Sequence, residues 1–407
     1  MTSRVIRSAG GALLAVAASA AVYAQTPASG FAEVLAIRSE VLGEDRVAWV
    51  RTPASYATSD SRFPVVYLTD AEAQFVHTAV TAEFLARNGR MPEVIVVGIT
   101  TTDRTRDLTP TRAAMPRPGG PPRELPTAGG ADRFLEFLER ELIPKIESTY
   151  RTVPYRVFAG HSFGGLFAMH AWTARPNLFH AVVAVSPTLV WDDRLIARRV
   201  RQTATDPRTA RRSLVVTVGN EGPEADRAFA ELRTVFEKQD LPRIDATFLC
   251  FPDDDHGSVV LPSHVAAFKA IFADWRAPLD PETGFPAGTL ADLQAHYRTL
   301  TSTLGVEIAP PEREVNLLGY RLLGAGRHDA ALEAFRFNAA AHPRSANVHD
   351  SLGEAYEKSG DPERARESYA RAVALGSENS DPNLEVYRRN WQRAADAARE
   401  TSPTTGS

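Results

Sequence analysis

The stretch VPYRVFAGHSFGGLFAMHAW, residues 153–172, decides the fold of this chain. Its first part is a short apolar run that ends at Gly160, and apolar residues at helical spacing follow from Leu166 onward. This order predicts a strand, a sharp turn and a helix. The turn matches G-x-S-x-G, in which a serine, here Ser162, is held in a strained backbone conformation that only small neighbours permit. We therefore predict a nucleophile elbow at Ser162, the alternative being an ordinary glycine-rich turn.

Apolar runs of strand length alternate with helical stretches on both sides of this turn. They lie at 63–68, 94–99, 181–185, 214–218 and 247–251, after two predicted strands at 33–38 and 46–51. Alternation of this kind predicts a mostly parallel sheet with helices on both faces. The fold class that we expect is α/β, with an α/β-hydrolase catalytic domain over residues 31–276.

Polar residues lie just past the carboxyl ends of four predicted strands, where parallel sheets place their chemistry. They are Asp70, Ser162, Glu221 and His256. A serine hydroxyl needs a base to take its proton, and the base needs an acid to orient it. The order serine, acid, histidine is the one that α/β-hydrolases use. We expect Ser162 as nucleophile, His256 as base and Glu221 as acid, with Glu224 in the same loop as the alternative acid.

The expected oxyanion hole consists of backbone N–H groups. One donor is Phe163, and the second comes from the turn after the strand 63–68, at Ala71 or Glu72. His161 lies inside the elbow, and we expect its side chain to point away from the site. No clustered histidines or cysteines suggest a catalytic metal. The predicted chemistry requires no cofactor.

Four segments of the chain carry a resemblance to a known family. They are FPVVYLTD (63–70), RTRDLTP (104–110), YRVFAGHSFGG (155–165) and SPTLVW (186–191). These segments resemble an esterase family of the α/β-hydrolases that includes enterochelin and salmochelin esterases, feruloyl esterases and esterase D-like thioesterases. RTRDLTP is the most specific of them, and it is most similar to the siderophore-esterase branch. The resemblance implies that Ser162 and His256 form the catalytic pair, with an acid at or near Glu221.

A long polar segment, residues 100–130, separates two predicted elements of the catalytic domain. It is rich in proline, arginine and glycine, and it is too long for a simple connection, which favours a binding loop. Disorder of its middle, residues 116–123, is the competing interpretation.

Several residues are candidates for substrate binding. Arg104 and Arg106 could bind a carboxylate or catecholate because arginine offers a planar fork of donors. The alternative is an internal ion-pair network that holds the loop. Asp70 is a further candidate because of its place at a strand end. Trp191 is expected to form a wall of the acyl pocket, with ordinary packing as the alternative.

The C-terminal third contains alanine, leucine, arginine and glutamate without strand-like runs. Three pairs of similar residues are 34 positions apart: Gly319 and Gly353, Ala331 and Ala365, Phe335 and Tyr369. This period resembles that of tetratricopeptide repeats. We expect helical repeats over 315–399, including a capping helix at 381–399, after a linker at 277–314 that contains a helix at 290–304. The repeats could bind a protein partner or mediate self-association, or they could be a packing appendage.

The N-terminus has the pattern of a secretory signal. Arg4 and Arg7 precede an apolar stretch, 12–21, and small residues precede Gln25. We expect a signal peptide over residues 1–24, with an uncleaved anchor as the alternative, and hence a periplasmic or secreted protein without a membrane span after cleavage.

Composition argues against nucleic-acid binding and against cysteine chemistry. The formal net charge is −4, and proteins that bind nucleic acid usually carry a basic patch. The single cysteine, Cys250, cannot form an intrachain disulfide, and its apolar surroundings argue against a catalytic thiol.

The function that we predict is an exported serine esterase that hydrolyses a small-molecule carboxylic ester through an acyl-enzyme. One alternative is an acyltransferase on the same fold. The other is a repeat-based interaction module that carries a vestigial hydrolase.

Overall fold

The N-terminal part of the protein is built on a mixed sheet. In the computed structural model, residues 30–116, 120–203, 212–238, 243–304 and 307–401 are described. Within them the sheet has eight strands in the order β1-β2-β4-β3-β5-β6-β7-β8. The strands are β1 (Glu33–Ser39), β2 (Glu44–Arg51), β3 (Phe63–Leu68), β4 (Ile95–Ile99), β5 (Thr152–His161), β6 (Ala181–Val185), β7 (Arg212–Gly219) and β8 (Ile244–Phe251). β2 is antiparallel to both of its neighbours, and all other neighbouring strands are parallel.

Helices cover both faces of this sheet, as the sequence predicts. They are α1 (Ala71–Arg87), α2 (Arg104–Leu108), α3 (Ala131–Phe137), α4 (Ile143–Thr149), α5 (Phe163–Ala174), α6 (Trp191–Thr203), α7 (Pro223–Lys238) and α8 (Val260–Ile271). Side chains alternate between the faces of a strand. In β3, Val66 and Leu68 pack in the core with α1 and α8, whereas Val65 and Tyr67 pack in the core that α3 to α7 cover.

The helical segment from Ala131 to Thr149 contains a wider turn. A π-helical turn, Leu138–Leu142, joins α3 to α4. Pro144 follows this turn, and proline has no N–H to donate to the carbonyl four residues earlier. The missing donor accounts for the local change in helical pitch.

The predicted binding loop contains some regular structure. α2 lies within residues 100–130, and an isolated antiparallel bridge joins Met115 to Arg123. Residues 117–119, in the middle of the loop, lie outside the described residues, as does the predicted signal peptide, residues 1–24.

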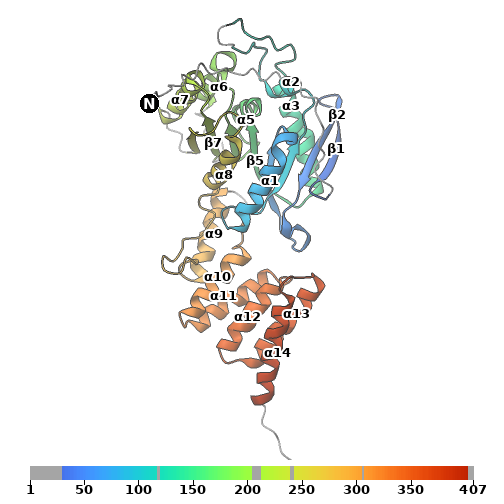
Figure 1. Ribbon diagram of the computed structural model, residues 1–407, viewed down its shortest axis with the longest axis vertical. Coiled ribbons are helices and arrows are strands. Elements are labelled where there is room, and N and C mark those ends of the chain that lie inside the picture. The colour runs from blue at the N-terminus through green and yellow to red at the C-terminus, as the bar shows by residue number, and fades with distance from the viewer. Residues whose placement is uncertain (1–29, 117–119, 204–211, 239–242, 305–306, 402–407) are drawn as a thin grey trace, which may run out of the picture.

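The C-terminal part is a stack of helices. They are α9 (Leu290–Leu304), α10 (Glu312–Gly324), α11 (His328–Ala341), α12 (Ala346–Lys358), α13 (Pro362–Glu378) and α14 (Leu384–Thr401). Figure 1 shows that this stack and α2 lie at opposite ends of the molecule. At the junction the ring of Tyr297 in α9 packs edge-on against Trp275, and its hydroxyl donates to the Trp275 carbonyl at 3.1 Å.

The 34-residue period appears in the packing of the helices. A Cβ at Gly319 would lie 2.6 Å from the Phe335 ring, and a Cβ at Gly353 would lie 2.6 Å from the Tyr369 ring. Only glycine therefore lets the aromatic ring of the next helix approach so closely, and the same contact recurs one period later. The assignment to tetratricopeptide repeats stays a prediction. No helix within the described residues has the length and apolar character needed to cross a membrane.

Candidate active site

Ser162 stands on a sharp turn between β5 and α5. Its backbone has φ 59° and ψ −114°, a conformation that residues other than glycine rarely adopt and that costs about 1–3 kcal/mol. The Ser162 N–H donates to the carbonyl of Val185, and its own carbonyl accepts from Leu166 in the first turn of α5. The predicted strand, turn and helix are thus present, and the turn projects the serine beyond the carboxyl edge of the sheet.

The glycines of the motif are required by close contacts. A Cβ at Gly160 would overlap the carbonyl of Gly164 across the turn. A Cβ at Gly164 would lie 2.5 Å from Oγ1 of Thr69, at the end of β3. The elbow therefore packs against the turn that follows β3, which brings Ser162 close to the start of α1.

His256 is hydrogen-bonded to Glu221. Nδ1 of His256 lies 2.6 Å from Oε2 of Glu221, and the Glu221 carboxylate also accepts from the Gly219 N–H at 3.4 Å. Burial disfavours the charged carboxylate, but hydrogen bonds from His256 and Gly219 outweigh it and lower the pKa of Glu221. Glu224 is exposed in the first turn of α7. Of the two carboxylates that the sequence left open, Glu221 is the one that contacts the imidazole.

The loop that carries His256 is anchored by hydrogen bonds. The Asn220 N–H donates to the Asp254 carbonyl at 2.7 Å, which ties the loops after β7 and β8 together. Oδ1 of Asp255 accepts from the N–H groups of Gly257 at 2.9 Å and Ser258 at 2.8 Å. This role of Asp255 was not predicted from the sequence. An aspartate side chain often accepts from the backbone N–H two residues later in a turn, so the sequence Asp255-His256-Gly257 could have indicated it.

The side chain of His161 does not point away from the site, and our expectation for it was wrong. Its Nε2 lies 2.7 Å from the carbonyl oxygen of His256, and the centroids of the two rings are 4.6 Å apart. Burial, with the nearby His256, lowers the pKa of His161 to about 4, so the ring is neutral at physiological pH and Nε2–H can donate. Because His161 precedes Ser162 in the chain, this contact holds the base loop beside the elbow.

Within the described residues, no hydrogen bond joins Oγ of Ser162 to the ring of His256. Catalytic hydrogen bonds are often long in structures without substrate and shorten only in the complex. The backbone N–H groups of Phe163, Ala71 and Glu72 lie in the first turns of α5 and α1, where no helical carbonyl can accept them. These are the groups expected to form the oxyanion hole.

Arg104 connects the two turns that flank the site. Its guanidinium donates to both carboxylate oxygens of Asp70, at 2.8 and 3.0 Å, and to the carbonyl of His161 at 3.1 Å. The guanidinium also lies 5.4 Å from the centre of the Phe163 ring. About a third of the Arg104 side chain is exposed, so it can still contact a bound molecule.

The contacts of Arg106 and Trp191 are with other residues of the protein. Arg106 forms ion pairs with Glu44 at 2.6 Å and Asp107 at 2.7 Å, which favours the internal network over substrate binding. Trp191 is fully buried, packs edge-on against Phe163 at 5.6 Å and donates to Oγ1 of Thr111. Its burial favours ordinary packing over a place in the wall of the acyl pocket.

The part of the chain that the structure describes was searched for a set of side chains that could bind a metal ion. No group of three or more histidine, cysteine, aspartate or glutamate side chains there is arranged to hold a metal ion.

A sheet of this strand order, with a serine elbow after β5 and polar residues beyond the carboxyl ends of β7 and β8, defines an α/β-hydrolase. A solved structure supports this class: an IroE-like serine hydrolase from Shewanella oneidensis has a TM-score of 0.63 and 28% identity, and it covers 74% of this chain and 98% of that one. Residues 39–240 match the model of the family named "Putative esterase", and this part of the chain belongs to that esterase family.

Two curated relatives are siderophore esterases by name. The ferri-bacillibactin esterase BesA of Bacillus subtilis is 35% identical over 154 residues, which is 34% of this chain and 52% of that protein. A siderophore enterobactin esterase of Emericella nidulans is 35% identical over 153 residues, which is 34% of this chain and 50% of that protein. The chain thus spans about half the length of these curated relatives.

Proposed function

We propose that this protein is an exported serine esterase that hydrolyses a carboxylic ester of the siderophore class through an acyl-enzyme. The observation that carries the proposal is the hydrogen bond between His256 and Glu221 beside the strained elbow of Ser162. The siderophore class is supported by the names of the two relatives above. Export is supported by the signal pattern of residues 1–24.

The proposed reaction has two halves. Oγ of Ser162 attacks the ester carbonyl while Nε2 of His256 takes its proton, and Glu221 stabilises the imidazolium through Nδ1. The N–H of Phe163, with that of Ala71 or Glu72, binds the negative oxygen of the tetrahedral intermediate. The intermediate expels the alcohol, which receives the proton from His256 and leaves an acyl group on Ser162. A water molecule then attacks in the same way and releases the acid.

Arg104, paired with Asp70, has two roles in the proposed reaction. Their ion pair lies between the start of α1 and the elbow, so it fixes the spacing of the two oxyanion donors. Nη1 of Arg104 makes no hydrogen bond within the described residues, so it is available to a catecholate or carboxylate of the substrate.

Substrate turnover tests the function directly. The purified protein without residues 1–24 should convert the cyclic triester enterobactin into linear acids, which mass spectrometry detects, and should hydrolyse p-nitrophenyl esters. A fluorophosphonate probe should label it once per chain. Added alcohols should not divert the acyl group, because water is the proposed acceptor. Failure to take the label and to cleave any of these esters would overturn the proposal, and transfer of the acyl group to an alcohol would favour an acyltransferase.

His161 supplies a prediction about positioning. Replacing His161 with alanine removes the donor to the His256 carbonyl, and we expect kcat to fall about 10- to 100-fold with little change in KM, since small displacements of a base cost that much. His161→Gln should recover most of the lost rate because its amide N–H can reach the same carbonyl. Equal kcat values for the alanine and glutamine variants, with both folded by circular dichroism, would show that this hydrogen bond does not position the base.

A further inference from the structure

Ser186, the residue directly after β6, combines two features that are rare in folded proteins. Its backbone φ is 41°, a left-handed value that is strained for any residue other than glycine. The residue is only 2% exposed, and its Oγ has no hydrogen-bond partner within the described residues. A strained backbone and a buried hydroxyl without a partner each cost stability, and both are typical of functional sites.

The backbone at Ser186 lies between the nucleophile and the strand that leads to the acid. The Ser162 N–H donates at 3.0 Å to the carbonyl of Val185, the residue before Ser186. On the other side, the Ser186 N–H donates at 2.9 Å to the carbonyl of Thr217 in β7. The turn at Ser186 is thus hydrogen-bonded both to the elbow and to the strand that precedes Glu221.

The Glu221 carboxylate lies on the side of β7 that faces Ser186. The Thr217 carbonyl points toward β6, because it accepts from the Ser186 N–H, and successive residues of a strand point in opposite directions. The Gly219 N–H, two residues further on, therefore also points toward β6. Oε1 of Glu221 accepts from this N–H at 3.4 Å. The carboxylate is therefore held beside the end of β6, where Ser186 lies.

The carboxylate of Glu221 can accept a further hydrogen bond. Oε2 lies 2.6 Å from Nδ1 of His256, whereas the contact of Oε1 with Gly219 is long, and a carboxylate oxygen can accept two bonds. Burial disfavours the charge, but hydrogen bonding to His256 and then the nearby Ser186 hydroxyl lower the pKa of Glu221. The hydroxyl therefore lies close to the carboxylate without reaching the geometry of a hydrogen bond.

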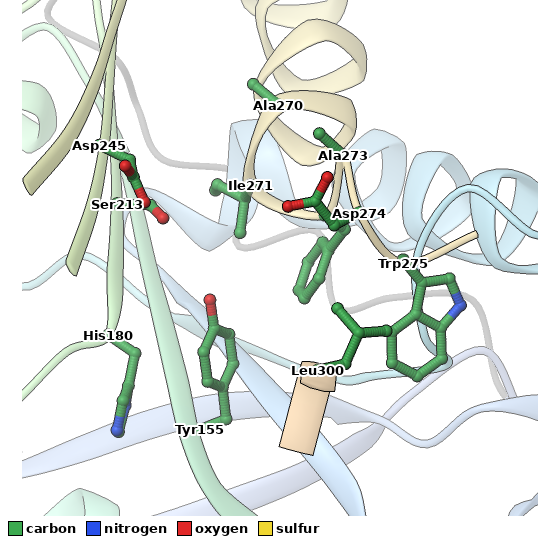
Figure 2. A pocket seen from close by; sticks show the side chains of 11 residues that line it. Tyr155, His180, Ser213, Asp245, Ala270, Ile271, Ala273, Asp274, Trp275 and Leu300 are labelled. Carbon is green, nitrogen blue, oxygen red and sulfur yellow. The ribbon is translucent and has the colours of Figure 1, made fainter. Parts of the chain in front are cut away.

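A molecule in the cavity beside β5 cannot be the missing partner of Ser186. This cavity has a volume of about 240 Å³, and Figure 2 shows Tyr155, Ser213 and Trp275 among its walls. Ser213 is opposite Ala181, the first residue of β6, whereas Ser186 follows the last one. The two lie at opposite ends of the strand, so the partner has to come from the candidate active site.

We propose that Ser186 is a positioning residue for the acid, and that its Oγ–H donates to Oε1 of Glu221 as the His256 imidazolium forms. This inference rests on the proposed function. The bond holds Oε2 toward Nδ1 of His256 and keeps the carboxylate ionised. Because the hydroxyl has no partner before the reaction and gains one during it, the bond stabilises the transition state more than the resting enzyme.

Two variants of Ser186 separate the hydroxyl from the strained backbone. Ser186→Ala and Ser186→Gly both lose the hydroxyl, but only glycine relieves the strain. We expect kcat for a p-nitrophenyl ester to fall about tenfold in both with KM unchanged, as is typical for loss of a hydrogen bond to a charged group. The melting temperature of Ser186→Ala should not fall, because the hydroxyl that it loses has no partner.

A matched control is Ser351→Ala in the helical stack. Ser351 is also 2% exposed, and its Oγ accepts from the Tyr320 hydroxyl at 3.1 Å. This variant loses a buried serine hydroxyl that has a partner, so it should lose stability and keep its kcat. In a Glu221→Ala background, Ser186→Ala should change kcat by less than about twofold, because Ser186 acts through the carboxylate.

Proton NMR tests the same contact without ester turnover. The Nδ1–H of His256 should give a far-downfield resonance in the wild type that is absent from Glu221→Ala and shifted in Ser186→Ala. This measurement separates failure of the inference from failure of the proposed function. The inference is overturned by an unchanged kcat in Ser186→Ala, by normal kcat in Ser186→Gly, by a tenfold loss that persists in the Glu221→Ala background, or by an unshifted resonance.

Discussion

Replacing Ser162 with alanine should lower kcat for an aryl ester by at least about 10⁴-fold. In a serine hydrolase, loss of the nucleophile removes the covalent route, and only the contribution of the oxyanion donors and of substrate binding remains. The strained backbone of the elbow is held by Val185 and Leu166 rather than by the serine hydroxyl. We therefore expect the variant to fold normally. Initial rates of p-nitrophenyl ester hydrolysis at saturating substrate provide the measurement.

Labelling distinguishes this loss from damage to the fold. Ser162→Ala should take no fluorophosphonate, whereas a variant at an exposed serine outside the site, such as Ser148 in α4, should still be labelled. Near-normal hydrolysis by a folded Ser162→Ala variant would show that another group is the nucleophile. It would also remove the basis of the proposed acyl-enzyme.

Replacing Glu221 with glutamine should lower kcat by about 10³- to 10⁴-fold, while Glu224→Gln should have almost no effect. Only Glu221 contacts Nδ1 of His256, and a neutral amide can neither stabilise the imidazolium nor hold the required tautomer. Glu224 is exposed in the first turn of α7, where its carboxylate interacts favourably with the helix dipole but makes no contact with the His256 ring. Glu224→Gln is a well-matched control for Glu221→Gln, because both variants lose one negative charge and their positions are three residues apart.

The kcat values of Glu221→Gln and Glu224→Gln can be compared over the neutral pH range because Glu221 is ionised there. Its pKa is lowered, so the wild-type carboxylate is charged throughout that range and its own titration does not shape the profile there. Rates for both variants should be compared with wild type at several pH values near neutrality. An equal loss in the two variants, or a greater loss in Glu224→Gln, would assign the acid to Glu224.

Local pattern and chain order were enough to predict the general architecture. Alternation of apolar runs and helical stretches from residue 63 onward leaves few ways to bury both faces of a sheet, so the fold class followed from the sequence. The elbow was predictable as well, because Gly160 and Gly164 are needed wherever a serine is held in this turn. Both features depend on residues close together in the chain, where backbone sterics dominate.

Contacts between distant loops were decided only by the tertiary structure. Glu221 and Glu224 have the same chemistry and are three residues apart, and only the path of the chain after β7 brings one of them to within 2.6 Å of His256. The inward orientation of the His161 ring and the separate tasks of Arg104 and Arg106 were likewise undecided in the sequence. A side chain's partner depends on a few ångströms of loop placement, whereas a strand depends on periodicity that the sequence itself contains.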